Sequence, residues 1–532
     1  MQRRIGLIER YGVLLFGGFL LFFLLRHSPH PRAVPGLLAI APSGYLRAAA
    51  QFNPFALLNQ RLGISASSFY SVGLLIVLVF LFVVYFRMLH IVRLQSQQHS
   101  RLAVILAGVL LFSLPLVLCP YIFSRDIYSY IIYGRIAALY GENPAISAPI
   151  AYAHDAFFPY LIAWQSTPSV YGPVWTLFSH GLTLVVERAG GVPWLYLLAY
   201  KLVALAAHLV NTLLIWWIMR AWKPEQQVYA ALLYAWNPVA LIEFVGSAHN
   251  DVLMISLILL AVLCTQHGYW RSAIVVLLAA VLVKWIAVVL LPLWAIYWLR
   301  RQMTWPGRLL LAGQAAAIVI VGATLLYMPY GQVLQSIGAP LQLQSGMQAE
   351  NSLGALAIRG GQEALVRLGV ASARDPAWRS AAEVAVAWCS KGLILLAGLV
   401  ALYVVWRRPA FERLLQAGCW LLLALLLIAP IFRVWYVTWP LALVALLDWR
   451  PAGRAISSLA AAAPFRYIQA ESPAWLDALI FLPVIVLLAY ELRQARLRRR
   501  LYTDFSHGSV FFGARGKKRS AHAKRTMRGR YE

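Results

Sequence analysis

The amino-acid sequence predicts an all-α protein that crosses a membrane many times. Its 532 residues are 61% hydrophobic and only 12% charged, with a mean hydropathy of +0.70, which is far from the composition of an ordinary globular protein. Apolar runs near or above the ~20 residues needed to cross the hydrocarbon recur along almost the whole chain. These runs contain Pro and Gly, which membrane helices tolerate, so we expect a helical bundle.

The charges have the distribution that is typical of a membrane protein. The formal net charge is +27, of which about ten lie after Ala489 and the rest mostly in short loops, the usual excess of cations on the cytoplasmic side. We therefore expect contact with anionic membrane lipid and no nucleic-acid binding. The four cysteines have no CxxC spacing and lie in or beside apolar runs, so we interpret them as core residues.

Charge parity, the requirement that successive spans leave the basic loops on the cytoplasmic side, determines the direction of each predicted span. A basic start and an apolar run over residues 1–25 predict an uncleaved first span with a cytoplasmic N-terminus. We expect further spans at about 69–87, 103–122, 195–219, 227–245, 251–267, 309–329, 390–406, 412–431, 434–448, 455–468 and 476–491. The run 273–299 is long for one span and has Lys284 at its middle, so we expect two short helices meeting at an external turn. The total is about fourteen, or about 12 to 14, spans.

This topology divides the chain into two parts. Residues 1–490 form the membrane domain, and residues 491–532 form a basic tail, which we expect to be disordered and cytoplasmic. Two large loops, 121–173 and 329–388, lie on the outer face, and both carry juxtamembrane helices. One of these helices, at 172–186, is too short for a comfortable span and is expected to lie along the membrane surface.

The first large loop carries the strongest chemical signal. It begins where an apolar run ends, and on a helix Asp126, Tyr130 and Tyr133 would share one face. A carboxylate at the membrane rim can accept the proton of an alcohol. The structural alternative is an interfacial charge paired with Arg125 or Arg135.

Aromatic residues are dense in this loop and just after it. Tyr128, Tyr130, Tyr171 and Trp175 are candidates for binding a sugar or an acceptor, because their rings can stack on sugar faces. Most aromatics here are also explained by the belts that Tyr and Trp form at membrane interfaces.

Four cations are candidates for binding a phosphate. Lys284 and Arg433 fall on the outer rim between spans, and Arg125 and Arg135 lie in the first loop. The phosphate of a lipid carrier lies at the headgroup level, so it needs cations at this depth. For each one the alternative is a snorkelling side chain at a helix end.

A polar turn follows the predicted span at 227–245. His249, Asn250 and Asp251 are candidates for binding the sugar or acceptor, and Asn250 or Asp251 could equally cap the next helix. The spacing of His249 and Asp251 is not specific for a metal, so we predict no metal site and leave dependence on a divalent metal open. The sequence also has no GxGxxG after a strand and no Walker motif, which disfavours a nucleotide sugar or ATP as donor.

Eight short segments together resemble a known family. They are 124–130 (SRDIYSY), 133–135 (YGR), 141–144 (GENP), 169–175 (SVYGPVW), 236–238 (WNP), 248–251 (AHND), 283–284 (VK) and 434–436 (VWY). Their types and order are similar to those of the bacterial polyprenyl-phosphomannose-dependent α-1,6-mannosyltransferases, which belong to the GT-C class of multi-spanning glycosyltransferases. The resemblance runs from about residue 100 to residue 450.

The resemblance implies a GT-C-type bundle in the bacterial cytoplasmic membrane. It implies inverting transfer of mannose, or a related hexose, from a polyprenyl phosphate to a glycan or glycolipid on the extracytoplasmic face. Asp126 matches the catalytic carboxylate of the first loop, and no cofactor beyond the lipid-linked donor is implied. Two other classes stay open: a transporter or flippase for a lipid-linked sugar, and a ligase that uses a lipid pyrophosphate donor.

Overall fold

The protein is an all-helical bundle with very little β-structure. The computed structural model describes residues 6–27, 34–41, 55, 58, 61–63, 65–94, 101–162, 164–345, 349–370, 375–447, 451–468, 478–491 and 493–494. Within these ranges the one regular β-pair joins β1 (Val34–Pro35) to β2 (Tyr121–Ile122) in antiparallel register. The all-α prediction is confirmed. The predicted basic tail lies almost entirely outside the described residues.

Helices follow one another through most of the described chain. The α-helices are α1 (Leu7–Leu25), α2 (Leu37–Ile40), α5 (Ala66–Leu94), α6 (Leu102–Val117), α7 (Asp126–Leu139), α8 (Pro173–Arg188), α9 (Pro193–Trp222), α10 (Gln227–Ala235), α11 (Pro238–Leu241), α12 (Asp251–Gln266), α13 (Trp270–Val283), α14 (Leu291–Arg301), α15 (Trp305–Tyr327), α16 (Val333–Ser345), α17 (Leu353–Arg367), α18 (Pro376–Arg407), α19 (Phe411–Ile428), α20 (Thr438–Ala445) and α21 (Pro451–Ala462). A further apolar helix covers Ala478–Glu491.

Short 3₁₀ and π segments connect them. They are η1 (Pro149–Tyr152), η2 (Phe158–Tyr160), η3 (Pro224–Gln226), η4 (Ile242–Gly246), η5 (Trp285–Leu290), η6 (Met328–Tyr330), η8 (Val434–Val437) and η9 (Ala463–Tyr467). Of these, η4 is a π-helix.

Several helices have the length and composition of membrane spans. Six of the described helices qualify, namely α1, α5, α9, α15, α18 and α19, and a seventh span results if the bent pair Pro224–Ala235 and Pro238–Gly246 counts as one. Five shorter apolar helices, of 10–17 residues, accompany them. The chain is therefore a helical membrane protein. The total of about fourteen spans stays a prediction, because helices such as α6 and α12 are shorter than the ~20 residues of a straightforward span.

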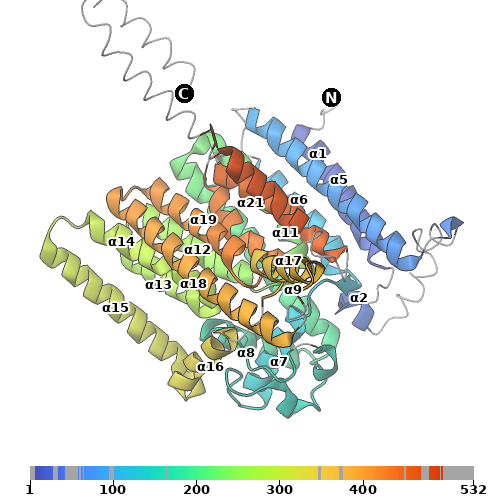
Figure 1. Ribbon diagram of the computed structural model, residues 1–532, viewed down its shortest axis with the longest axis horizontal. Coiled ribbons are helices and arrows are strands. Elements are labelled where there is room, and N and C mark those ends of the chain that lie inside the picture. Colours follow the sequence, from blue (N-terminus) through green and yellow to red (C-terminus); the bar gives the residue numbers. More distant parts are fainter. Residues whose placement is uncertain are drawn as a thin grey trace, which may run out of the picture.

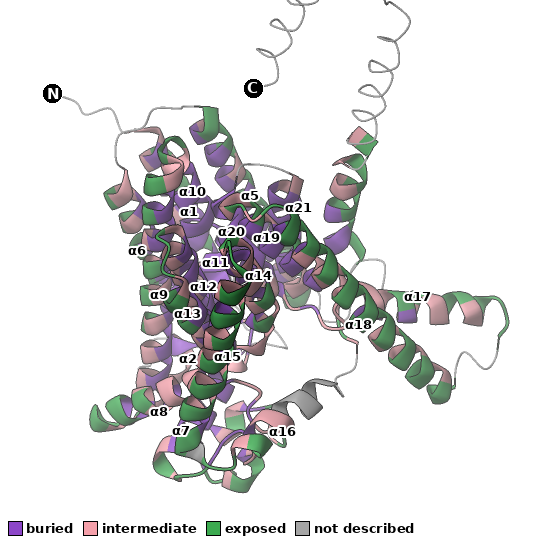
Figure 2. Ribbon diagram, turned by 90° about the vertical axis from the view of Figure 1, so that its left-hand side faces the viewer, coloured by how far each residue is buried: buried purple, intermediate pink, exposed green. Residues whose placement is uncertain are grey.

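The outermost apolar helices face away from the protein core. Only 6% of the most apolar window of α15 and 11% of that of α18 are buried. Figure 2 shows the exposed surface of α15 and α18 against a buried core around α10, α11 and α12. This is the distribution expected where lipid is the solvent.

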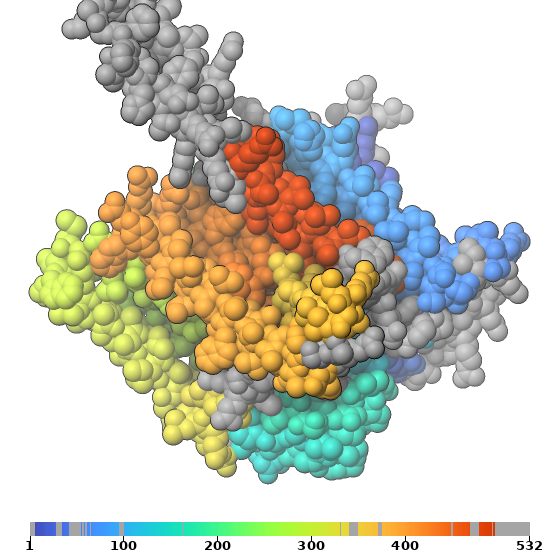
Figure 3. All heavy atoms as spheres, viewed as in Figure 1, coloured from blue at the N-terminus to red at the C-terminus, as the bar shows by residue number. Residues whose placement is uncertain are grey.

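The first loop is a folded unit at one end of the bundle. Figure 1 places α7 and α8 together at the lower end, beside α16, and Figure 3 shows the first-loop segment as a compact lobe that touches the yellow α16 segment. The Asn143 side chain donates to Ser336 Oγ on α16 at 2.7 Å. The two predicted outer loops, 121–173 and 329–388, therefore meet.

Asn237 and Pro238 interrupt the helical run between α10 and α11. Pro238 has no N–H to donate, and the Asn237 side chain accepts from the N–H groups of Val239 and Ala240 at 3.1 and 3.3 Å. The two helical parts meet at 49°. His208 Nε2 lies 3.0 Å from the Ala235 carbonyl, so a side chain of α9 pairs with one of the backbone groups that the break leaves free.

Of two further helix boundaries, the sequence predicted one and not the other. The expected pair of short helices around Lys284 is present: α13 ends at Val283, and Lys284 itself is extended, with φ −149° and ψ 121°. By contrast, α18 begins at Pro376, well inside the predicted loop 329–388. Asp375 caps it, because its Oδ1 accepts from the Ala377 N–H at 2.9 Å.

Candidate active site

Helix α7 places Asp126 at its first turn. Arg125 is the N-cap residue, and the Asp126 N–H donates to Ser124 Oγ at 3.2 Å. A carboxylate at a helix N-terminus interacts favourably with the helix dipole. The Asp126 side chain is 16% exposed, so it is mostly enclosed and still reachable from outside.

Close packing of α7 on α8 fixes that position. A Cβ atom at Gly134 would lie 2.8 Å from the backbone oxygen of Ser179 and 2.8 Å from Thr183 Oγ1. The two helices therefore approach to a distance that only glycine permits at this point.

A buried histidine lies beside the carboxylate. His249 Nδ1 is 3.7 Å from Asp126 Oδ2, within ion-pair distance, and its Nε2 is 3.3 Å from Oε2 of Glu243. The His249 ring stacks on Trp435, with centroids 3.9 Å apart and planes 20° from parallel. Two carboxyl groups from different parts of the chain thus flank one imidazole.

A second carboxylate holds a lysine in the same region. Lys284 Nζ donates to both oxygens of Asp251, at 2.9 and 2.8 Å, and Trp439 Nε1 also donates to Asp251. The ammonium lies 5.4 Å from the ring centroid of Tyr436. The break of the helix at Lys284 is what aims this cation inward.

A second cation approaches from the start of η8. Arg433 forms two hydrogen bonds with the Glu350 carboxylate, at 2.5 and 2.7 Å. Two backbone hydrogen bonds fix Glu350: its N–H donates to the Pro430 carbonyl at 3.0 Å, and its carbonyl accepts from the Phe432 N–H at 2.9 Å.

The surroundings shift the protonation equilibria of the site. Burial raises the pKa of Asp126 above its ordinary value, and the charges of Lys284 and Arg433 offset part of this increase. Burial, and then the Lys284 ammonium, lower the pKa of His249 well below its ordinary value. The cluster therefore favours a neutral imidazole, which carries one N–H.

Most of the predicted site residues meet at this point. Besides Asp126, His249, Asp251, Lys284 and Arg433, the cluster includes Tyr130, Asn250, Tyr171 and Trp175. The Tyr130 hydroxyl donates to Asn250 Oδ1 at 3.4 Å and lies 3.4 Å from His249 Nδ1. The rings of Tyr171 and Trp175 contact the Tyr130 ring edge-on, each at 5.1 Å between centroids.

Three predicted residues have other partners. The Tyr128 hydroxyl donates to the Pro35 carbonyl at 2.6 Å, and Arg125 donates to the Tyr160 carbonyl at 3.4 Å. Arg135 lies nine residues beyond Asp126, about 13 Å along the helix. It binds Asp155 at 2.9 Å and Glu187 at 2.5 Å, which indicates a structural role in the loop.

The predicted site residues did not include five members of the cluster: Glu243, Glu350, Trp435, Trp439 and Tyr467. Two of them had a signal in the sequence: Trp435 lies in the 434–436 motif, and Glu243 is a carboxyl group within an apolar segment, which is uncommon without a function. Among the described residues, no group of three or more His, Cys, Asp and Glu is arranged to hold a metal ion.

The fold and the cluster define a polytopic helical membrane protein with a polar site at the ends of its broken helices. A family model described as "Alpha-(1->6)-mannopyranosyltransferase, N-terminal domain" matches residues 35–300, half of the chain. The chain belongs to this family of glycosyltransferases, and the resemblance seen in the motifs is confirmed. The matched region contains Asp126, His249 and Lys284 and ends before Arg433.

Three similar proteins carry names that agree with this assignment. An α-(1→6)-mannopyranosyltransferase A of Mycobacterium tuberculosis is 26% identical over 379 residues, which cover 66% of this chain and 67% of the relative. A second M. tuberculosis α-(1→6)-mannopyranosyltransferase is 29% identical over 165 residues, 30% of this chain and 26% of its own. The α-(1→6)-mannopyranosyltransferase A of Corynebacterium glutamicum is 26% identical over 187 residues, 34% of this chain and 35% of its own.

Proposed function

We propose that this protein transfers mannose, or a related hexose, from a polyprenyl monophosphate to a glycan or glycolipid acceptor. The observation that carries the proposal is the position of Asp126: a partly exposed carboxylate at a helix start, with Lys284 and Arg433 close enough to affect its pKa. Family membership supports mannose as the sugar.

The chemistry follows from the charges around Asp126. Asp126 accepts the proton of the acceptor hydroxyl while that oxygen forms its bond to C1 of the sugar. The bond between C1 and the phosphate oxygen breaks on the opposite face, so the configuration inverts. Lys284 and Arg433 bind the departing lipid phosphate, and their positive charges stabilise the negative charge that it gains.

The remaining residues of the cluster orient the substrates. Tyr130, Tyr171 and Trp175 present ring edges and a hydroxyl next to His249 and Asn250, a combination that suits a sugar. Asp251 holds Lys284 in place through two hydrogen bonds. We place this site on the extracytoplasmic face of the bacterial cytoplasmic membrane, with both termini inside, because the charge parity of the sequence favours it.

The test is transfer of radiolabelled mannose from polyprenyl-phosphate mannose in membranes that contain the protein. Asp126→Asn keeps the size of the side chain and removes the base, so we expect transfer to fall by about 10²- to 10⁴-fold with unchanged expression. Glu225→Gln, which alters an exposed carboxylate in the loop before α10, serves as the matched control and should retain full activity.

Two results would contradict the proposal. Transfer at the wild-type rate by Asp126→Asn would show that Asp126 is not the base. Movement of the donor across a reconstituted bilayer without any new glycosidic bond would favour the transporter that the sequence left open.

A further inference from the structure

Glu243 is a buried carboxyl group that the transfer mechanism does not use. It lies in η4, the π-helix that follows α11, and its side chain is fully buried. Single π-helical turns within helices frequently occur at functional sites. From this turn Glu243 faces His249, while Ile242, Phe244 and Val245 pack in the apolar core.

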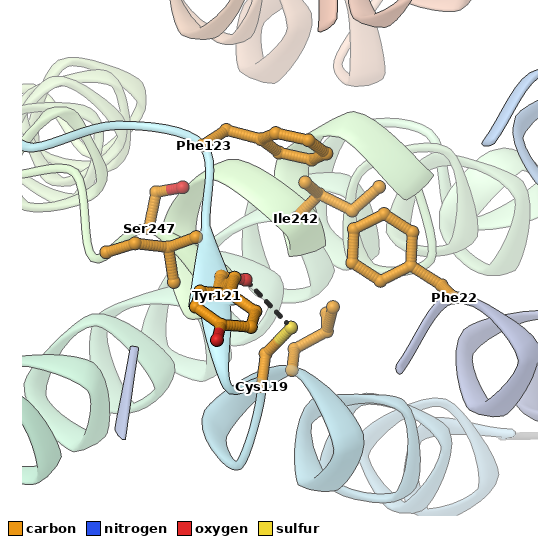
Figure 4. A pocket seen from close by; sticks show the side chains of 9 residues that line it. Phe22, Cys119, Tyr121, Phe123, Ile242 and Ser247 are labelled. Atoms are coloured by element: carbon orange, nitrogen blue, oxygen red, sulfur yellow. Dashed lines mark hydrogen bonds between the residues drawn. The ribbon is translucent and has the colours of Figure 1, made fainter. Parts of the chain in front are cut away.

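The far side of this turn is apolar. A small pocket lies next to η4, and Phe22, Phe123, Ile242 and Ser247 are among the side chains that line it (Figure 4). Glu243 itself is not among the residues that line this pocket. The Tyr467 hydroxyl donates to Glu243 Oε1 at 2.8 Å, and the Tyr467 ring stacks on Phe123 with centroids 4.0 Å apart.

The second oxygen of Glu243 faces the histidine. Oε2 lies 3.3 Å from His249 Nε2, and neither atom has any other hydrogen-bond partner among the described residues. The backbone ties the two residues together, because the His249 N–H donates to the Glu243 carbonyl at 3.2 Å. Ala248 between them has a φ of +57°, a conformation that non-glycine residues seldom adopt and that often marks functional turns.

This arrangement determines which nitrogen of His249 carries a hydrogen. Among the described residues, the fully buried Glu243 carboxyl group contacts a hydroxyl and an imidazole and no lysine or arginine, an environment that favours its protonated form. The protonated carboxyl group donates from Oε2 to Nε2, so the neutral imidazole carries its hydrogen on Nδ1; an ionised Glu243 would instead accept a hydrogen from Nε2 and leave Nδ1 without one. The Nδ1–H faces Asp126 Oδ2 at 3.7 Å and the Tyr130 hydroxyl at 3.4 Å, which can accept it because its own hydrogen goes to Asn250 Oδ1.

We infer that Glu243 is a positioning residue for the transfer reaction, because it keeps an N–H of His249 directed at Asp126. This inference rests on the proposed function, in which Asp126 is the base. Without Glu243 the hydrogen can move to Nε2, and the lone pair of Nδ1 then faces the Asp126 carboxylate. The stack on Trp435 fixes the ring plane but not the position of the hydrogen.

Two variants of Glu243 test the inference. Gln retains a donor that can bind Nε2, so Glu243→Gln should keep kcat within about threefold of the wild type. Leu cannot, so Glu243→Leu should lower kcat by roughly 10- to 100-fold, a part of the ~10²–10⁴ that a general base contributes. The KM for the donor should not change, since the proposed function assigns the donor phosphate to Lys284 and Arg433 and not to Glu243.

The pH profile separates positioning from a merely structural role. The charged or titratable groups that face the Glu243–His249 pair are Asp126, Tyr130, Asp251, Lys284 and Tyr467. Loss of the Nδ1–H removes a partial positive charge from the side of the imidazole that lies 3.7 Å from the Asp126 carboxylate, so the acidic limb of kcat should move to higher pH in Glu243→Leu. It should stay in place in Glu243→Gln.

An activity-independent measurement distinguishes failure of this inference from failure of the proposed function. Nitrogen NMR of ¹⁵N-histidine-labelled protein, with the His249 signals assigned by loss in His249→Gln, reports which ring nitrogen carries the hydrogen. We expect Nδ1–H in the wild type and in Glu243→Gln, and a shift to Nε2–H in Glu243→Leu. The expected NMR pattern in a protein that transfers no sugar would support the positioning and refute the function.

Three results would overturn the inference: an unchanged tautomer in folded Glu243→Leu, wild-type kcat in that variant, or equal loss of kcat in Glu243→Gln and Glu243→Leu. If Glu243→Leu does not fold, the nitrogen spectra of the wild type, Glu243→Gln and Tyr467→Phe decide. Tyr467→Phe removes a donor to Oε1 and so favours the protonated carboxyl group, which means that the hydrogen should stay on Nδ1 and the acidic limb should not move to higher pH. A hydrogen on Nε2 in any of these three proteins would overturn the inference.

Discussion

At the scale of single residues, the environment of Asp126 decides how it reacts. Burial works against its negative charge, and Lys284 and Arg433 favour that charge. The net result is a carboxyl group with a raised pKa, which is a stronger base than a solvated aspartate. A base is most effective when its pKa is close to the operating pH.

The raised pKa predicts the acidic limb of the pH profile. Transfer needs the unprotonated form of Asp126, so kcat/KM should fall as the pH decreases through the raised pKa. Because that pKa lies above the ordinary value of about 3.9, the decline should begin at a higher pH than for an unperturbed carboxylate. The measurement is kcat/KM for the acceptor against pH, with thermal unfolding followed over the same range. A rate that stays constant down to about pH 4 would contradict the shift.

The ion pair between Arg433 and Glu350 predicts that Glu350 competes with the donor phosphate for Arg433. The Glu350 carboxylate accepts from both terminal nitrogens of the arginine, Nη1 and Nη2, and the Arg433 and Glu350 side chains are 25% and 51% exposed. An ion pair this exposed contributes less than about 1 kcal/mol, so a phosphate can displace the carboxylate. We expect Glu350→Gln to lower the KM for the polyprenyl-phosphate donor by about two- to fivefold, with little change in kcat.

The control for this variant is Glu383→Gln. It removes another Glu–Arg pair, with Arg379 on α18, and it should leave the KM for the donor unchanged. An unchanged or higher KM in Glu350→Gln would show that Glu350 does not compete with the donor.

At the scale of elements, breaks in helices build the site. Asn237-Pro238 bends one helix and leads into η4 and His249, and the extended backbone at Lys284 ends α13. Non-helical backbone at membrane depth is tolerated where protein buries it. The first break leads into η4, which carries Glu243, and the second break is at Lys284 itself, so each break lies beside a polar side chain of the cluster.

The contact between α7 and α8 predicts a pair of glycine variants with opposite effects. Gly134→Ala would place a methyl group against backbone atoms of α8, and such overpacking costs about 1–3 kcal/mol. It should also displace Asp126 and lower kcat. Gly181→Ala, on α8 with no atom within 4 Å of the new Cβ, should instead raise stability by about 0.5–1 kcal/mol, because alanine favours the helix.

Thermal unfolding of both variants in detergent, together with their kcat values, is the measurement. Equal unfolding temperatures for Gly134→Ala and Gly181→Ala would show that the close approach of α7 and α8 is not needed.

At the scale of the whole molecule, the sequence predicted features that local chemistry determines. The helical class and the break at Lys284 were predictable from composition and charge, and the motifs singled out Asp126, His249 and Lys284, which the structure brings together. The start of α18 was missed because residues 376–389 are too polar for a span, although Asp375-Pro376 is a common helix start.

Contacts between distant segments were beyond prediction. Asp126 meets His249 only through tertiary packing, and the pair between Glu350 and Arg433 joins residues 83 positions apart. The ion network of Arg135 with Asp155 and Glu187 depends on how the first loop folds back on itself. A single sequence does not show which distant residues pair. Four cations could therefore be proposed for the site, but not which of them lie near Asp126 and which, like Arg135, form ion pairs within the first loop.

The orientation of the whole molecule gives the last prediction. Charge parity predicts that the first loop lies outside and the loop before α10 inside. Single cysteines at Glu142 and Glu225, both exposed, should therefore differ in intact cells: a membrane-impermeant thiol reagent should label Glu142→Cys and not Glu225→Cys. The background is Cys389→Ser, since Cys389 is the exposed one of the native cysteines in the described residues. Permeabilised cells provide the control, in which both sites should react. Labelling of Glu225→Cys in intact cells would place the Asp126 cluster on the cytoplasmic side and would refute an extracytoplasmic transfer reaction.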